Sequence, residues 1–143
     1  FLPTLPEDIA FAIEFRDRSW MHDGVLALLA EHNVALALTD ARWIPRKQML
    51  ALAERPTADF VYVRWMGADR DIVDYSRLQI DRSRELELWA GVISHVAARG
   101  RTVYGYVNNH FAGHSPASAR ELQRLLQIEP VAPEQLGEQM TLF

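Results

Sequence analysis

Four short apolar runs rich in β-branched residues recur along this 143-residue chain, and each is followed by a stretch with helical periodicity. The apolar runs cover residues 9–15, 34–39, 60–65 and 102–107. The helical stretches cover residues 22–33, 47–54, 83–99 and 115–126. Strands that are apolar on both faces and alternate with helices are typical of parallel sheets. The sequence therefore predicts an α/β fold of four consecutive βα units, in an open doubly wound sheet or in a (β/α) barrel.

Composition and charge exclude several classes of function. The formal net charge of −4 argues against a general nucleic-acid binder, which usually carries a basic excess. Cysteine is absent, which removes disulfides, thiolate metal sites and a cysteine nucleophile, and fits a reducing, cytoplasmic location. No apolar run has the length of a membrane span. No Gly-x-Gly-x-x-Gly or Walker sequence follows a predicted strand, so the best-known nucleotide-binding folds are also disfavoured.

Polar side chains recur where each predicted strand ends. They are Glu14 and Arg16, then Asp40, then Arg64, then Asn108 and Asn109. In parallel α/β folds the carboxyl ends of the strands lie at one edge of the sheet, and ligands bind there. Since side chains alternate along a strand, every second residue shares a face. We therefore expect a site for an anionic or polyhydroxylated small molecule, whose floor is formed by Glu14, Arg16, Arg64 and Asn108.

Several chemistries are open for this site. Glu14 and Asp40 end neighbouring strands and could act as a carboxylate pair in glycoside hydrolysis, although a carboxylate paired with arginine is a poor general acid. An ion pair of Glu14 with Arg64 could instead only close the mouth of a barrel. Ser115 suits the cap of the last helix, whose amino terminus could bind phosphate or carboxylate.

Metal and nucleic-acid sites are less favoured by the pattern. His110 and His114 are four residues apart, but they lie in a predicted loop, where histidines are more often solvated than ligating. The basic residues Arg42, Arg46 and Lys47 cluster in an acidic chain, where such a group is usually a solvated face. We therefore expect no metal, and no cofactor can be identified.

Several motifs resemble those of a known family. They are AIEFRDRSW, NVALALTD, TADFVYVRWMG and VYGYVNNHFAGHSPASA, in that order between residues 9 and 126. They are similar to the family called domain of unknown function 72, also known as YecE-like. The resemblance implies a TIM-like barrel of about eight strands, of which this chain would carry the last four βα units.

The resemblance also implies which residues occupy the family's motif positions. Glu14, Arg16 and Trp20 match the first motif, and Asp40 matches the acid that closes the next strand. Arg64 and Gly67 match the third motif, and the last is matched by Asn108, Asn109, Gly113, Pro116 and Ala119. One departure is Met66, because the commonest family pattern has histidine there.

These inferences combine into one expectation. Residues 1–128 would form the C-terminal half of a single barrel domain, and residues 129–143 a loosely ordered tail. The expected catalytic residues are Glu14, Arg64 and Asp40. The expected ligand-binding residues are Arg16, Trp20, Tyr75, Asn108, Asn109 and Ser115. The ligand would be an anionic, phosphorylated or sugar-like small molecule, and the protein a hydrolase or lyase-type enzyme, or alternatively a non-enzymatic ligand- or protein-binding domain.

A chain that forms half a barrel is also expected to need a binding partner. Four βα units leave two strand edges and one apolar sheet face uncovered. The chain begins with Phe1 rather than methionine, which suggests a piece of a longer protein. We therefore expect it to bind a missing N-terminal half or to associate with itself.

Overall fold

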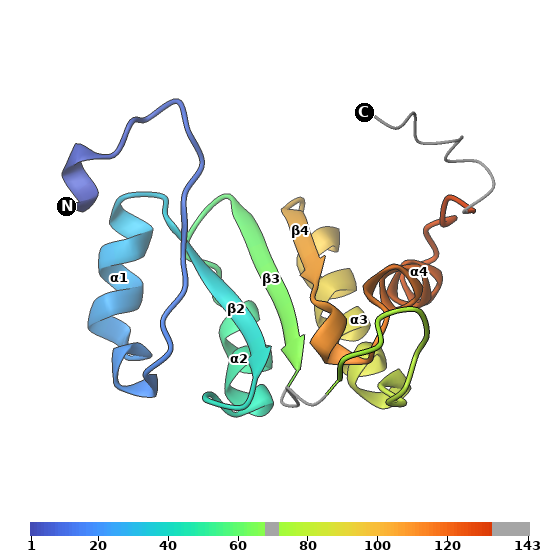
Figure 1. Ribbon diagram of the computed structural model, residues 1–143. Coiled ribbons are helices and arrows are strands. Elements are labelled where there is room, and N and C mark those ends of the chain that lie inside the picture. The colour runs from blue at the N-terminus through green and yellow to red at the C-terminus, as the bar shows by residue number, and fades with distance from the viewer. Residues whose placement is uncertain (68–71, 133–143) are drawn as a thin grey trace, which may run out of the picture.

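The computed structural model describes residues 1–67 and 72–132 and consists of a sheet with helices packed on one side (Figure 1). The strands are β1 (Ala12–Ile13), β2 (Ala35–Ala41), β3 (Phe60–Gly67) and β4 (Thr102–Val107). The α-helices are α1 (Asp23–Glu31), α2 (Arg46–Ala53), α3 (Ser83–Ala98) and α4 (Ser115–Leu125). Three short 3₁₀ helices are η1 (Leu2–Thr4), η2 (Arg18–Trp20) and η3 (Asn109–Phe111). The predicted alternation of strands and helices is confirmed, and most of the predicted tail lies outside the described residues.

The four strands form one parallel sheet in the order β1-β2-β3-β4. The α/β class predicted from the sequence is therefore confirmed. Because all strands run the same way, their carboxyl ends meet at one edge, the lower edge in Figure 1. Within the described residues the sheet is open, with β1 and β4 at its two edges.

The first strand is much shorter than the predicted run 9–15. It pairs with β2 only at Ala12 and Ile13, next to a bond from the Ala35 amide to the Phe11 carbonyl at 2.8 Å. Phe11, Ile13 and Phe15 of this segment are partly buried and pack against the core, so the apolar character at these positions reflects burial more than strand pairing. In the described part of the chain, β1 is an edge strand and pairs with one neighbouring strand only. The burial of its apolar side chains therefore does not require a long ladder of backbone hydrogen bonds.

The core lies between the sheet and its helices. On the helix side, large residues of β2 and β3 such as Leu38, Val63 and Trp65 are buried against α2 and α3. Trp65 and Trp89 meet edge to face with ring centroids 5.8 Å apart. Gly105 of β4 makes room for this packing, because a Cβ there would lie 2.8 Å from the Trp65 ring.

The opposite face of the sheet, which we call the inner face, is aromatic over β3 and β4. Phe60 lies 5.7 Å from Tyr104 between ring centroids, and Tyr62 lies 5.1 Å from Tyr106. Tyr104 is 47% exposed and Tyr106 is 54% exposed, and no helix is drawn in front of these strands in Figure 1. On β2 the same face carries small residues, Ala35, Ala37 and Thr39, in register with β1 and β3.

A glycine at the end of β3 sets the position of the following elements. Gly67 has a φ of 75°, and a Cβ added to it would lie 2.7 Å from the His110 carbonyl carbon and from the Phe111 Cα. The backbone of η3 therefore packs directly on the end of β3. This contact explains the match of Gly67 to the resembled motif in structural terms.

Gly67→Ala should destabilise the protein more than Gly100→Ala, which provides a matched control. Both glycines have left-handed backbones, with φ of 75° and 80°, so both substitutions carry the same conformational cost of about 1 kcal/mol. A Cβ added at Gly67 would meet backbone atoms of η3, whereas nothing lies within 4 Å of a Cβ added at Gly100. We expect Gly67→Ala to lose a further ~1–3 kcal/mol in urea unfolding. Equal losses would show that η3 does not pack on the end of β3.

Candidate functional site

Glu14 binds two guanidinium groups at the carboxyl end of the sheet. Its Oε2 accepts a hydrogen bond from Arg64 Nη1 at 2.5 Å, and its Oε1 accepts one from Arg16 Nε at 3.3 Å. The Glu14 side chain is 15% exposed, Arg64 35% and Arg16 73%. One carboxylate between two guanidinium groups leaves this cluster with a net positive charge. Its free N–H donors suit an oxyanion.

The Glu14–Arg64 bond crosses over a whole strand. Glu14 follows β1 and Arg64 lies in β3, and in the sheet order β2 lies between them. Strands two apart are separated by roughly 9–10 Å. The crossing is possible because β2 has only Ala37 and Thr39 on the inner face there, in register with Tyr62 and Arg64.

A hollow of about 400 Å³ lies on the inner face beside this bond. Alanines line it on the β1 and β2 side, and aromatic rings line it on the β3 and β4 side. Its lining is Ala10, Ala12, Glu14, Ala37, Phe60, Tyr62, Arg64 and Tyr104. Small residues leave space here and rings offer flat apolar walls, an arrangement that suits a compact ring-bearing ligand.

Asp40 does not join this cluster, although we expected it beside Glu14. It pairs in register with Trp65, on the helix side of the sheet, and is 3% exposed. Its Oδ2 accepts hydrogen bonds from Arg46 Nε at 2.6 Å and from Trp89 Nε1 at 2.7 Å. The hydrogen bond to Asp40 raises the pKa of the Arg46 guanidinium above its usual value. The carboxylate pair needed for glycoside hydrolysis is therefore not formed, and Asp40 ties β2 to α2 and α3.

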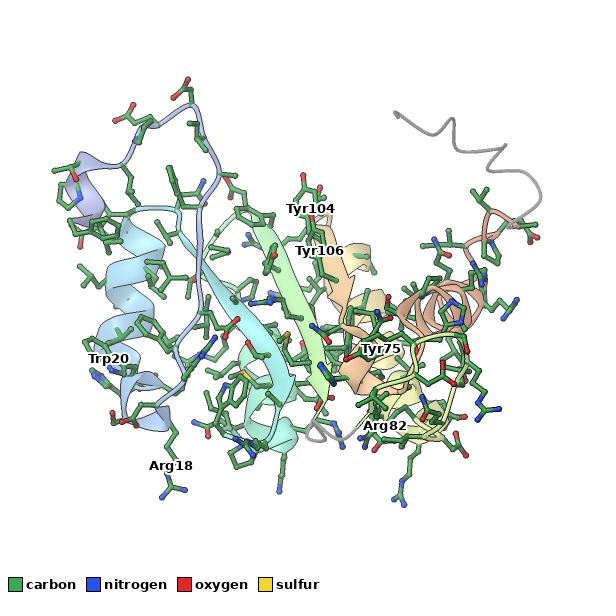
Figure 2. All side chains as sticks on the ribbon, viewed as in Figure 1. Arg18, Trp20, Tyr75, Arg82, Tyr104 and Tyr106 are labelled. Atoms are coloured by element: carbon green, nitrogen blue, oxygen red, sulfur yellow. The ribbon has the colours of Figure 1, made fainter. Side chains whose placement is uncertain are left out.

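The two aromatic residues predicted to bind the ligand, Trp20 and Tyr75, lie at opposite edges of the sheet. The Trp20 ring stacks on Phe15 with centroids 5.2 Å apart, in a nearly parallel arrangement. Figure 2 shows Trp20 at the α1 edge and Tyr75 beyond β4. They do not face each other across one pocket. Trp43, which the sequence did not single out for the site, lies nearer the cluster, with Arg16 Cζ 5.4 Å from its ring centroid.

The aspartate before Trp20 fixes its local turn. The Oδ1 of Asp17 accepts a hydrogen bond from the Ser19 amide at 2.9 Å and caps η2. This bond lowers the pKa of the exposed Asp17 carboxyl below its ordinary value. Asp17 therefore remains ionised and shapes the loop that carries Trp20.

Tyr75 contacts His110, a residue that sequence reasoning weighed only as a metal ligand. The Tyr75 hydroxyl lies 3.2 Å from His110 Nε2, and the two rings meet edge to face at 5.4 Å. His110 Nδ1 is buried and has no hydrogen-bond partner among the described residues. The available signal was its place, three residues after a predicted strand end. Its pairing with Tyr75 spans 35 positions and could not be predicted from the local sequence.

The amides after β4 serve the backbone. Asn108 Oδ1 accepts from the His110 amide at 2.9 Å, and Asn109 Oδ1 accepts from the Ser115 amide at 2.8 Å. Helix α4 begins at Ser115 and its cap position is His114, one residue earlier than predicted. The first amide of α4 is therefore already bonded to Asn109. These residues shape the loop at the strand ends, and their predicted ligand contacts stay a prediction.

The described residues contain neither a metal-binding cluster nor a membrane-spanning helix. No three histidine, aspartate or glutamate side chains in ranges 1–67 and 72–132 are placed to share a metal ion. Within the same part of the chain, no helix combines the length and the apolar character needed to cross a membrane.

Comparison with protein families gives one match over nearly the whole chain. The family model described as "Protein of unknown function DUF72" matches residues 1–140. Among curated proteins, none matches the chain significantly.

Solved structures show the same fold in longer proteins. A DUF72 family protein from Enterococcus faecalis V583 matches with a TM-score of 0.62 and 18% identity, over 85% of this chain and 50% of that one. A DUF72 family protein from Thermotoga maritima MSB8 matches with a TM-score of 0.60 and 21% identity, over 84% of this chain and 47% of that one. The chain therefore spans about half the length of these proteins.

Proposed function

The chain belongs to DUF72, a family of proteins of unknown function, and on this basis we propose that its four βα units are part of a TIM-like barrel with a small-molecule site at the carboxyl ends of the strands. The parallel order β1-β2-β3-β4, with each strand beside the next in sequence, is the order found in such barrels. The similarity to DUF72 structures of about twice the length also supports it.

The proposed ligand is a small anion, phosphorylated or sugar-like. The observation that carries this proposal is the Glu14 carboxylate holding both Arg64 and Arg16, which concentrates positive charge at a ligand-binding edge. Guanidinium groups bind phosphate and carboxylate through paired N–H donors. The neighbouring hollow of about 400 Å³ has room for the rest of the ligand.

Arg64→Gln should weaken binding of inorganic phosphate by about tenfold or more, because a hydrogen bond to a charged group contributes roughly 1.5–3 kcal/mol. Binding to the 143-residue chain would be followed by NMR chemical shifts at low salt. The control is Arg55→Gln, which removes an exposed arginine paired with Asp23 on the surface. Equal affinities for Arg64→Gln, Arg55→Gln and the unmodified chain would contradict the anion site.

A hydrolase or lyase-type enzyme is the second candidate function. It is favoured by the contact between the Tyr75 hydroxyl and His110, since both groups can transfer protons and both lie at the end of the sheet where active sites form. In that function, Glu14 and Arg64 would act on the reacting group. In a ligand-binding domain, Glu14 only positions the arginines.

Glu14→Gln separates these two functions. If Glu14 only positions arginines, removing its negative charge should raise phosphate affinity about fivefold, because ~1 kcal/mol of repulsion is lost. If Glu14 is catalytic, hydrolysis of p-nitrophenyl phosphate by the unmodified chain should fall at least ~100-fold in the variant. We expect the first result. Loss of turnover without a gain in affinity would favour the enzyme.

The inner face is proposed to be covered by further βα units that complete the barrel. Support comes from the exposed aromatic rings on this face and from the two open sheet edges. The covering units would come from an N-terminal half or from a second copy of the chain. A cytoplasmic location is proposed with it, because the chain has no cysteine.

The isolated 143-residue chain should therefore associate rather than remain monomeric. Light scattering with intact mass spectrometry would measure its mass in solution. Tyr106→Glu places a charge on the inner face and should shift the chain toward monomer, whereas Leu88→Glu, at an exposed position on α3, should not. A stable, folded monomer of the unmodified chain would contradict the half-barrel proposal.

A further inference from the structure

Trp43 is the residue that the chain after β2 brings to the carboxyl edge of the sheet. It lies in the turn that follows this strand, where Ala41 and Ile44 form an antiparallel bridge. The hydrogen bond between Asp40 and Arg46 at 2.6 Å joins the chain on the two sides of this turn. The turn is therefore held at both ends, and the residue that it carries has a fixed place at this edge.

Packing rather than hydrogen bonding holds the Trp43 ring. The residue is partly buried and packs against the hydrophobic core. Its Nε1 is buried and has no hydrogen-bond partner in the described part of the chain. Trp89, by contrast, donates its Nε1 hydrogen to Asp40 at 2.7 Å. What Trp43 offers at this edge is therefore the face of its ring rather than its N–H group.

The guanidinium group of Arg16 lies over the Trp43 ring. Its Cζ is 5.4 Å from the ring centroid, within the range of about 6 Å in which a cation is attracted to an aromatic face. The Arg16 side chain is 73% exposed, and within residues 1–67 and 72–132 its one hydrogen bond runs from Nε to Glu14 at 3.3 Å. A single long hydrogen bond is a weak restraint on a side chain with so much rotational freedom. The ring supplies the second contact.

These two contacts leave the end of the Arg16 guanidinium group open. Glu14 accepts the hydrogen bond from Nε, and Trp43 covers a face of the group. Nη1 and Nη2 donate to no other group among the described residues. Such a pair of nitrogens can bind two oxygens of one phosphate or carboxylate group at once. Donors that are already held in one plane lose less freedom when an anion binds.

Arg16 needs this additional contact more than Arg64 does. Both guanidinium groups bond Glu14, Arg64 to Oε2 and Arg16 to Oε1. Arg64 belongs to β3 and its side chain is 35% exposed, whereas Arg16 lies in a bend after β1. The backbone of Arg64 is thus held by strand pairing on both sides, with β2 and β4. Arg16 has no such support, so its place at the cluster depends on side-chain contacts.

We propose that Trp43 is a positioning residue of the anion site, which holds the Arg16 guanidinium group by a cation–π contact and presents its Nη1 and Nη2 donors to the bound anion. The inference rests on the proposed anion site and adds to it a residue from the turn after β2. The matching ligand group carries at least two terminal oxygens on one atom, as a phosphate ester or a carboxylate does. In this role Trp43 itself does not touch the ligand.

The first measurement compares binding of inorganic phosphate to the unmodified chain, to Trp43→Leu and to Trp43→Phe, followed by NMR chemical shifts at low salt. Trp43→Leu removes the aromatic face and should weaken binding about two- to fivefold, the equivalent of the ~0.5–1 kcal/mol of an exposed cation–π contact. Trp43→Phe keeps an aromatic face and should retain most of the affinity.

The second measurement repeats Trp43→Leu in a chain that already carries Arg16→Gln. If Trp43 acts through Arg16, the second substitution should not weaken phosphate binding further, because the interaction that it removes is already lost. Since Trp43 packs against the core, Trp43→Leu is expected to unfold at a lower urea concentration. Urea unfolding of every variant therefore serves as the check that binding is measured on folded protein.

The outcomes separate this inference from the proposed function. Unchanged phosphate affinity in Trp43→Leu, alongside weakened affinity in Arg64→Gln, would overturn the inference and leave the anion site standing. An equal loss from Trp43→Leu with and without Arg16 would also overturn it, because Trp43 would then act on the ligand or on the fold directly. The same holds if Trp43→Phe binds as weakly as Trp43→Leu. Phosphate binding that ignores Arg64 and Arg16 would remove the proposed function, and the inference with it.

Discussion

The bond between Glu14 and Arg64 is the interaction on which the candidate site depends. It joins β1 to β3 across β2, at 2.5 Å between Oε2 and Nη1. A pair this poorly exposed loses hydration, and the loss is offset only by close contact and further hydrogen bonds. Arg16 supplies one such bond at 3.3 Å. The crossing also requires small side chains on the inner face of β2, where Ala37 and Thr39 lie in register with Tyr62 and Arg64.

The helix side of β2 instead needs large side chains. There Leu36 and Leu38 fill the space beneath the helices, and Asp40 ends the row as a buried carboxylate. Its bonds to Arg46 and Trp89 join β2 to α2 and α3 at the same edge where the site lies. Breaking a buried pair of this kind by removing one partner is strongly destabilising. On its helix side β2 thus carries a buried carboxylate bonded to α2 and α3, and on its inner face it carries small residues over which the Glu14–Arg64 bond crosses.

Sequence reasoning recovered the βα order because hydrophobic period and strand composition are local signals. It also predicted that Glu14, Arg16 and Arg64 lie together, because alternate residues of a strand share a face and parallel strands end at the same edge of the sheet. It did not separate Asp40 from them, because a strand buried on both faces shows no polar alternation. Side-chain size was the missed signal: Ala35, Ala37 and Thr39 alternate with Leu36, Leu38 and Asp40. The Tyr75–His110 contact could not be predicted, because it depends on how two loops fold over the same sheet edge.

The shortness of β1 links the site to the edge of the sheet. The ladder with β2 ends at Ile13, so Glu14 lies one residue beyond the last pairing. The position of Glu14 is therefore set by its side-chain bonds as well as by the backbone. An anion bound to the N–H donors of Arg64, as proposed above, would weaken the tie between β3 and the chain after β1. Binding of the proposed ligand would then be coupled to the order of this edge, and any βα unit packed against β1 would experience the change.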